Sequence, residues 1–168
     1  MTVAVLMGVS GSGKTTVARG VAGRTGWRLI EGDSFHPPEN VAKMHAGIPL
    51  TDEDRWPWLR AIAREIDAMR ASSESAVVAC SALKRAYRDI LIGARADVVL
   101  VYLHGTQALI AARLATRQGH FMPPALLESQ FATLEEPGDD ERPIVVSIDA
   151  APDAIVDAVV RQLKERAA

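Results

Sequence analysis

The sequence predicts a three-layer α/β fold, in which one parallel β-sheet lies between two layers of helices. Two observations lead to this prediction. Short apolar runs rich in β-branched residues alternate along the chain with longer segments of helical character, a pattern typical of parallel sheets with helical crossovers. The first apolar run also leads directly into a glycine-rich segment and then a helix. Because ligands of such sheets bind at the carboxyl ends of the strands, the residues that follow each strand are the candidate functional residues.

The predicted strands are short, continuous apolar runs, which is how strands that are buried on both faces appear in a sequence. The first run starts at the second residue of the chain, and the last precedes the C-terminal helix. In order, they are residues 2–6, 27–30, 76–80, 98–103 and 143–148.

The predicted helices lie between these strands, with a short additional helix in the proline-rich loop after the second strand. Thr51 or Asp54 can cap the third helix, with Pro57 in its first turn. Pro123 and Pro124 open the sixth helix. In order, the helices are residues 14–24, 38–46, 55–71, 84–94, 106–117, 123–134 and 152–166.

Length and composition indicate a single domain, residues 1–168. The chain is 48% hydrophobic and 24% charged with a net charge of −2, an ordinary globular balance. This charge gives no general attraction to nucleic acid or to an anionic membrane, and no apolar run approaches the roughly 20 residues of a membrane span. The chain has one cysteine, Cys80, and we expect no signal peptide, so a cytoplasmic protein is predicted.

Residues 8–15, GVSGSGKT, match the phosphate-binding pattern G-x-x-x-x-G-K-[ST] at every fixed position. The glycines allow successive backbone N–H groups to turn toward one anion, and the helix that follows adds its own unpaired N–H groups. Lys14 can reach the β- and γ-phosphates of a nucleotide, and the Thr15 hydroxyl can ligate Mg²⁺. A glycine-rich turn without a ligand would not require this position between a strand and a helix. The sequence therefore predicts binding of ATP and Mg²⁺ by Gly8, Ser10, Gly11, Ser12, Gly13, Lys14, Thr15 and Thr16.

The phosphate loop alone does not distinguish a kinase from a GTPase or a motor ATPase. The chain is short for a large ATPase and contains no N-K-x-D sequence for reading guanine. A kinase also needs a group that orients the acceptor hydroxyl. Asp33, which follows the second strand, is the candidate to orient that hydroxyl and accept its proton; a role in a turn or helix cap is the alternative.

Residues 113–135 form the predicted lid. Arg113 and Arg117 are four residues apart and therefore share one helix face, from which guanidinium groups can bind phosphoryl oxygens. Gly119 and the two prolines that follow interrupt the helix. Either arginine alone would be read as a solvated surface residue. Together they predict nucleotide binding by both, with Arg117 stabilising the transferred charge.

Four segments of the sequence resemble the small bacterial-type gluconokinases. They are residues 7–16, 31–59, 80–91 and 119–137, in the expected order over nearly the whole chain. The resemblance implies a P-loop kinase fold with strand order 2-3-1-4-5, a mobile lid, and ATP-dependent phosphorylation of D-gluconate on its 6-hydroxyl. It also implies a substrate-binding region at about 33–60 and a homodimer. Glu31 stands where many members have aspartate, and we expect this change to be minor.

A polyhydroxy acid needs cations for its carboxylate and hydrogen-bonding partners for its hydroxyls. The candidate cations are Lys43, Arg55, Lys84 and Arg88, of which Lys84 and Arg88 are four apart on one predicted helix and can converge. The candidate hydroxyl partners are Asp33, His36, Asp54, Ser81 and Gln130. The resemblance implies that Asp33, Arg55, Lys84 and Arg88 contact the substrate, but which cation binds the carboxylate stays open.

Two other functions stay open at this point. One is a kinase for a different small hydroxy acid or sugar, and the other is a nucleotide-binding regulator without catalysis. A regulator would not need the acceptor-side carboxylate of Asp33. Elsewhere, the acidic run 135–141 is predicted to be a solvated loop, and residues 147–152 are a candidate contact for adenine.

Overall fold

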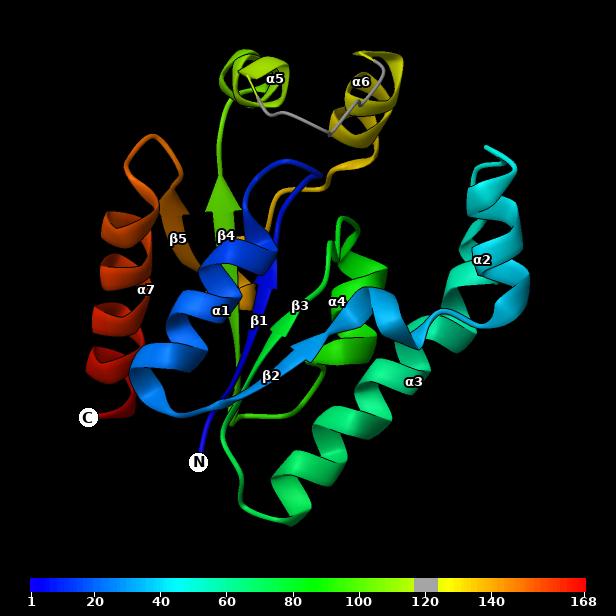
Figure 1. Ribbon diagram of the computed structural model, residues 1–168. Helices are drawn as coiled ribbons and strands as arrows, with labels where there is room; N and C mark the ends of the chain where they lie inside the picture. The colour runs from blue at the N-terminus through cyan, green and yellow to red at the C-terminus, as the bar shows by residue number, and fades with distance from the viewer. Residues whose placement is uncertain (117–123) are drawn as a thin grey trace.

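One parallel β-sheet organises the computed structural model, which describes residues 1–116 and 124–168. The strand order is β2-β3-β1-β4-β5, as predicted (Figure 1). All pairings are parallel, and β1 lies at the centre, bonded to β3 and to β4. The strands are β1 (Val3–Met7), β2 (Arg28–Glu31), β3 (Ala76–Ala79), β4 (Val98–His104) and β5 (Ile144–Ser147).

Helices cover both faces of this sheet, which confirms the predicted three layers. Helices α1 and α7 lie on one face and α3 and α4 on the other, while α5 and α6 lie beyond the carboxyl ends of the strands (Figure 1). The helices are α1 (Lys14–Thr25), α2 (Pro38–His45), α3 (Asp52–Ala71), α4 (Arg85–Leu91), α5 (Gln107–Thr116), α6 (Pro124–Thr133) and α7 (Pro152–Ala167), with 3₁₀ helices η1 (Gly32–Phe35) and η2 (Asp139–Glu141). No helix in the described residues is long and apolar enough to cross a membrane.

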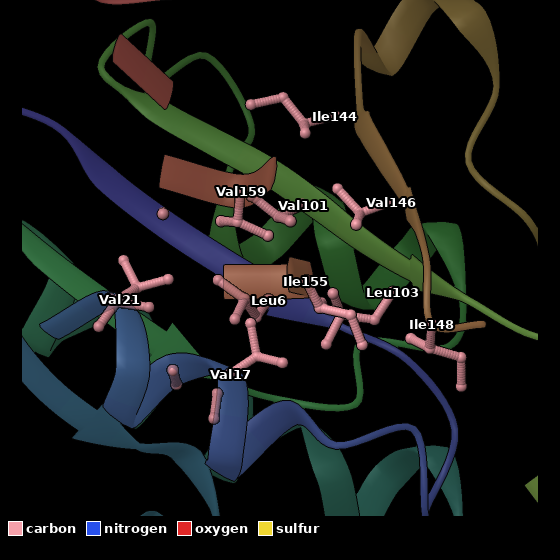
Figure 2. Packing of buried hydrophobic residues seen from close by; sticks show 14 of the residues in the cluster. Leu6, Val17, Val21, Val101, Leu103, Ile144, Val146, Ile148, Ile155 and Val159 are labelled. Carbon is pink, nitrogen blue, oxygen red and sulfur yellow. The ribbon is translucent and has the colours of Figure 1, made fainter. Parts of the chain in front are cut away.

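The core is divided by the sheet into two clusters because successive side chains of each strand point to opposite faces. Figure 2 shows the cluster between the sheet and helices α1 and α7. Leu6 of β1 and Val101 of β4 meet Val17 of α1 and Val159 of α7 there, and each is at most 2% exposed. Burying β1 on both faces holds the start of the phosphate loop in a rigid position.

Two helices differ from their predicted limits by more than one residue. Helix α3 begins three residues earlier, because Thr51 and Asp54 act together rather than as alternatives. The Asp54 N–H donates to the Thr51 hydroxyl (3.1 Å), and the Thr51 N–H donates to the Asp54 carboxylate (2.9 Å), which is a capping box. Pro57 therefore lies in the second turn, not the first. Helix α4 is shorter than predicted and begins after Lys84, whose backbone is extended.

Replacing either of two glycines of α1 by alanine is expected to change stability, but in opposite directions. A Cβ at Gly20 would lie 2.5 Å from a methyl carbon of Val156 in α7, whereas a Cβ at Gly23 would meet nothing within 4 Å. Gly20→Ala is expected to destabilise the protein by about 1–3 kcal/mol through overpacking. Gly23→Ala is expected to stabilise it by about 0.5–1 kcal/mol through helix propensity. Urea unfolding measures both, and equal effects of the two changes would contradict the close packing of α1 on α7.

Candidate active site

The phosphate loop leaves the carboxyl end of β1 and ends at the first residue of α1. Gly11 (φ 82°) and Gly13 (φ 89°) adopt left-handed backbone conformations that suit glycine and let neighbouring N–H groups face the same side. The Lys14 ammonium group folds back over the loop and donates to the carbonyl oxygens of Gly8 (2.8 Å) and Val9 (3.0 Å). The loop therefore presents backbone donors, a helix N-terminus and one ammonium group to an anion.

Two acidic residues, Asp33 and Glu31, lie near enough to this ammonium group to affect its pKa. Burial lowers the pKa of Lys14, and the nearby negative charges of Asp33 and Glu31 act against that shift. The Thr15 hydroxyl donates to Glu31 Oε2 at 3.3 Å. The other carboxylate oxygen, Glu31 Oε1, is buried and has no hydrogen-bond partner among the described residues. A buried carboxylate oxygen without a partner is costly, so this corner is suited to a cation.

A hydrated Mg²⁺ fits this donor set. The ion prefers oxygen ligands and usually keeps several waters while it binds one or two carboxylates and the phosphates of its substrate. Thr15 and Glu31 supply a hydroxyl and a carboxylate beside the phosphate loop. In residues 1–116 and 124–168 no group of three or more His, Cys, Asp or Glu side chains could hold a metal.

A pocket of about 240 Å³ opens beside the phosphate loop. Its walls come from the loop, α1, α5 and the start of α7, and they are mostly apolar. The Arg113 guanidinium lies at its edge, where it donates to the Ala150 carbonyl oxygen at 3.3 Å. This position suits a flat heteroaromatic base whose phosphates lie on the loop. The lining residues are Gly11, Ser12, Gly13, Thr16, Val17, Arg113, Leu114, Pro152 and Ile155.

Asp33 lies in the 3₁₀ helix η1, which follows β2, and its side chain is exposed. Gly32 is required before it, because a Cβ there would lie 2.5 Å from the Ala79 carbonyl oxygen of β3. The Trp58 indole donates to the Gly32 carbonyl oxygen at 2.8 Å and anchors the turn to α3. Neighbouring elements therefore hold the backbone of Asp33 while its carboxylate stays accessible.

His36 forms a polar link between this turn and α3. Its ring stacks on Trp58 with centroids 4.1 Å apart. The Asn40 amide donates to the Asp54 carbonyl oxygen (2.9 Å) and lies 3.2 Å from His36 Nδ1, so Nδ1 accepts and the neutral ring carries its proton on Nε2. Burial lowers the pKa of His36, while Asp33 opposes and Arg55 adds to that shift.

The loop between β3 and α4 connects the site to three other elements. The carbonyl oxygens of three consecutive residues each accept a hydrogen bond from a different part of the chain. The bonds are Gly8 N–H to Ser81 (3.2 Å), the Arg88 guanidinium to Ala82 (2.9 Å) and Glu135 N–H to Leu83 (2.8 Å). Ala82 has a left-handed backbone (φ 46°), a conformation that costs energy for a residue other than glycine.

The four candidate substrate cations differ in their partners. Lys43 bonds to Asp54 at 2.7 Å, Arg88 to Glu141 at 2.7 Å, Lys84 to both oxygens of Asp52 at 3.2 Å, and Arg55 to the Leu50 carbonyl oxygen at 2.8 Å. Arg88 is buried, with its side chain 1% exposed, and Glu141 is 9% exposed. Burial alone would raise the pKa of Glu141, but hydrogen bonds from Arg88 and Gly138 lower it.

Arg88 and Lys84 therefore do not converge in this structure. The prediction that they converge required both residues to lie within one helix. Lys84 instead precedes α4, and its backbone is extended. In the acidic run 135–141, predicted to be a solvated loop, Glu135, Glu136, Asp139 and Asp140 are exposed as expected, but the Glu141 side chain is only 9% exposed. Glu135 accepts from the Arg85 N–H (3.0 Å), and Glu141 pairs with Arg88, so this run is bound to α4.

Gln130 of α6 meets the phosphate loop. The Ser10 N–H donates to Gln130 Oε1 (2.6 Å), and Gln130 Nε2 donates to the Ser10 hydroxyl (2.7 Å). These two bonds use one acceptor and one donor of the side-chain amide. In this arrangement Gln130 connects the predicted lid to the nucleotide site, although the sequence assigned it to the substrate hydroxyls.

Comparison with known proteins identifies the family of this chain. A family model described as an AAA domain matches residues 3–137. The chain is 49% identical to a gluconokinase from Gluconobacter oxydans over 95% of this chain and 90% of that protein. It is 42% identical to the thermoresistant gluconokinase of Escherichia coli over 96% of this chain and 93% of that protein. This chain belongs to the gluconokinase family.

The crystal structure of a gluconokinase from Sinorhizobium meliloti matches this gluconokinase-family chain with a TM-score of 0.89. The two are 46% identical, and the match covers 98% of this chain and 93% of that one. Both the fold and the kinase assignment of the sequence are thereby confirmed.

The predicted site residues of this family member fall into three groups. Gly11, Ser12, Gly13, Thr16 and Arg113 line the pocket beside the phosphate loop. Asp33 lies in η1, Arg55 lies in the first turn of α3, and His36, Ser81 and Lys84 lie in the segments that follow η1 and β3. Arg88 and Gln130 bond to the protein itself, as does Lys43 with Asp54. The predicted catalytic residue Arg117 lies outside the described residues, as does the rest of 117–123.

Sequence reasoning missed two kinds of residue. Glu31 is the last residue of β2 and lies where the rule about strand ends points, but it was not predicted to be a site residue. Asp52 and Tyr87 gave no comparable signal, because an acidic residue at the start of a helix and a tyrosine within one usually have structural roles. Their contacts, described below, come from the packing of α3 against α4.

The lowered pKa of His36 makes stability depend on pH. Below about pH 6.5 the unfolded chain binds a proton at this histidine more readily than the folded protein does, so stability falls as the pH is lowered. His36→Gln is expected to lose less stability than the wild type between pH 7.5 and 5.5. His45→Gln, an exposed histidine on α2, is the control and is expected to follow the wild type. Urea unfolding at the two pH values measures the difference, and equal pH dependence in all three proteins would contradict it.

Proposed function

We propose that this chain transfers the γ-phosphoryl group of ATP to the 6-hydroxyl of D-gluconate, giving 6-phosphogluconate and ADP. The observation that carries the proposal is the placement of Asp33 and the phosphate loop at the same edge of the sheet. The negative charge of Asp33 acts on the Lys14 ammonium group, so the two lie in one electrostatic environment. Membership of the gluconokinase family supports gluconate as the acceptor.

When bound, ATP supplies the phosphoryl group and Mg²⁺ neutralises part of its charge. The N–H groups of the phosphate loop and the Lys14 ammonium hold the phosphates. To do so, Lys14 replaces its hydrogen bonds to the carbonyl oxygens of Gly8 and Val9 with bonds to phosphate oxygens. Thr15 and Glu31 would hold the ion. The pocket beside Arg113 takes the base. Asp33 orients the acceptor hydroxyl and accepts its proton. Positioning and charge stabilisation account for the chemistry without a covalent intermediate.

Residues 113–135 act in this proposal as a lid over the transferred group. Two described contacts support the role: Arg113 lies at the nucleotide pocket, and Gln130 bonds to Ser10 of the phosphate loop. Arg117 is proposed to stabilise the charge on the transferred phosphoryl group. Closure of such a lid excludes water, which would otherwise compete with the sugar hydroxyl as acceptor. The predictions of a homodimer and of a cytoplasmic location stay predictions.

The proposal predicts that Lys14→Met and Asp33→Asn each lower kcat for gluconate by at least about 100-fold. Lys14→Met loses an ammonium group that binds the phosphates, and Asp33→Asn loses the carboxylate that orients the acceptor hydroxyl and accepts its proton. Glu39→Gln, which removes a different exposed carboxylate on α2, is the control and is expected to keep wild-type activity. A coupled assay for ADP release with and without gluconate measures all four proteins, and thermal unfolding checks that each is folded.

The same assay separates the other candidate functions. A panel of related sugar acids and neutral sugars tests whether another acceptor is preferred to gluconate. ADP release that no acceptor stimulates would indicate a nucleotide-binding regulator. Wild-type turnover by Asp33→Asn would remove Asp33 from the role of base while leaving the nucleotide site in place.

A further inference from the structure

Helices α3 and α4 meet at a cluster of two cations, one carboxylate and one tyrosine. The Lys84 ammonium lies 3.2 Å from both oxygens of Asp52, and the Tyr87 hydroxyl donates to Asp52 at 2.5 Å. Arg55 donates to the Tyr87 hydroxyl oxygen at 3.3 Å and lies 3.9 Å from Asp52. We call these four residues, Asp52, Arg55, Lys84 and Tyr87, the α3–α4 cluster.

The charges of this cluster do not balance. Lys43 and Arg88 each have a carboxylate of their own, Asp54 and Glu141. Arg55 and Lys84 share the single carboxylate of Asp52 among the described residues. Two positive charges on one negative charge leave the cluster ready to take up one further anion.

Both cations of the cluster lie next to the Tyr87 ring. The Arg55 guanidinium and the Lys84 ammonium lie 5.6 and 5.8 Å from the centre of the same Tyr87 ring. Trp56 packs against this ring edge-to-face at 5.7 Å, which fixes its orientation. Arg55 and Lys84 are 27% and 31% exposed, so both cations are partly desolvated and still accessible. Charge-assisted hydrogen bonds are stronger in such surroundings than in open water.

Tyr87 and Asp52 hold the cations in place. Burial and the bond to Asp52 raise the pKa of Tyr87 to about 12, so its hydroxyl stays protonated and donates. The same bond and the one from Lys84 lower the pKa of Asp52, which keeps that carboxylate charged. Asp52 thus orients Lys84 directly, and Tyr87 links Arg55 to Asp52.

The cluster also lies within electrostatic reach of the reacting end of the site. Asp33 and Arg55 both act on His36, and their effects on its pKa are opposite in sign. His36 therefore lies near both the carboxylate proposed to orient the acceptor hydroxyl and one of the two cations of the cluster.

Resting on the proposed function, we propose that Arg55 and Lys84 bind the carboxylate of the sugar acid. Asp52 and Tyr87 are positioning residues that hold the two cations together and thereby favour an anionic acceptor over a neutral one. This assigns the carboxylate to one pair of the four candidate cations and gives two further residues a part in specificity.

The test compares gluconate with gluconamide, a neutral acceptor of nearly the same shape. Arg55→Met and Lys84→Met each remove a charge but keep the length of the side chain. Each is expected to raise KM for gluconate about 10- to 100-fold, the effect of losing a hydrogen bond to a charged group. KM for gluconamide changes far less, so the preference for gluconate in kcat/KM falls by a similar factor.

Tyr87→Phe tests the positioning role. It keeps the ring against Trp56 and loses only the hydroxyl, so KM for gluconate is expected to rise about 3- to 10-fold while kcat changes little. Tyr87→Ala is expected to lower stability as well, and partial recovery of KM in Tyr87→Phe separates packing from hydrogen bonding. Arg85→Met is the matched control, because Arg85 is next to Lys84 but pairs with Asp140; its preference for gluconate is expected to be that of the wild type.

The outcomes separate this inference from the proposed function. A wild-type enzyme that does not phosphorylate gluconate would overturn the proposed function itself. Active wild type with equal kcat/KM for gluconate and gluconamide would overturn the carboxylate assignment alone. So would equal losses on both acceptors in Arg55→Met and Lys84→Met, since those would indicate a structural role for the cluster.

Discussion

The parallel pairing of β1 with both β3 and β4 is the constraint on which the site depends. All five strands run in the same direction, so the loops that follow β1, β2 and β3 leave the sheet at one edge. The hydrogen bond from Gly8 N–H to the Ser81 carbonyl oxygen joins two of these loops directly. Because β1 is buried on both faces, the phosphate loop starts from a point that cannot shift without disturbing both cores.

Ion pairs divide the charged residues of this edge into a buried pair and a more exposed group that shares one carboxylate. Arg88 and Glu141 are buried together, and removing one partner of such a pair is far more costly than the pair is stabilising. They hold the Ala82 loop and the acidic run against α4. Arg55 and Lys84 are less buried and share one carboxylate. The net charge of −2 matters little here, because screening limits exposed charges to about 8 Å at physiological ionic strength.

Most of the fold could be predicted from local patterns, and most of the nucleotide site from one motif. Strand and helix positions agree with the structure to within a few residues, since buried strands and amphipathic helices have distinct periods. The errors occur where two residues act together, as at Thr51 and Asp54. The residues that bind the sugar acid were harder to predict than those that bind the nucleotide. Spacing along a helix indicates which residues share a face, but not which element covers that face, so it did not reveal that Arg88 pairs with Glu141. The substrate contact of Arg88, which the resemblance implied, stays a prediction.

The sequence by itself determined the strand–helix alternation, the phosphate loop at residues 8–15 and the resemblance to gluconokinases. Each of these features depends on residues that are close together in the chain. Only the tertiary structure decided the partners of the charged and amide side chains. Gln130 bonds to Ser10, Arg88 to Glu141, and Lys84 to Asp52, across 120, 53 and 32 residues of chain. No local pattern encodes such distances; they follow from how α3, α4 and α6 pack around a parallel sheet.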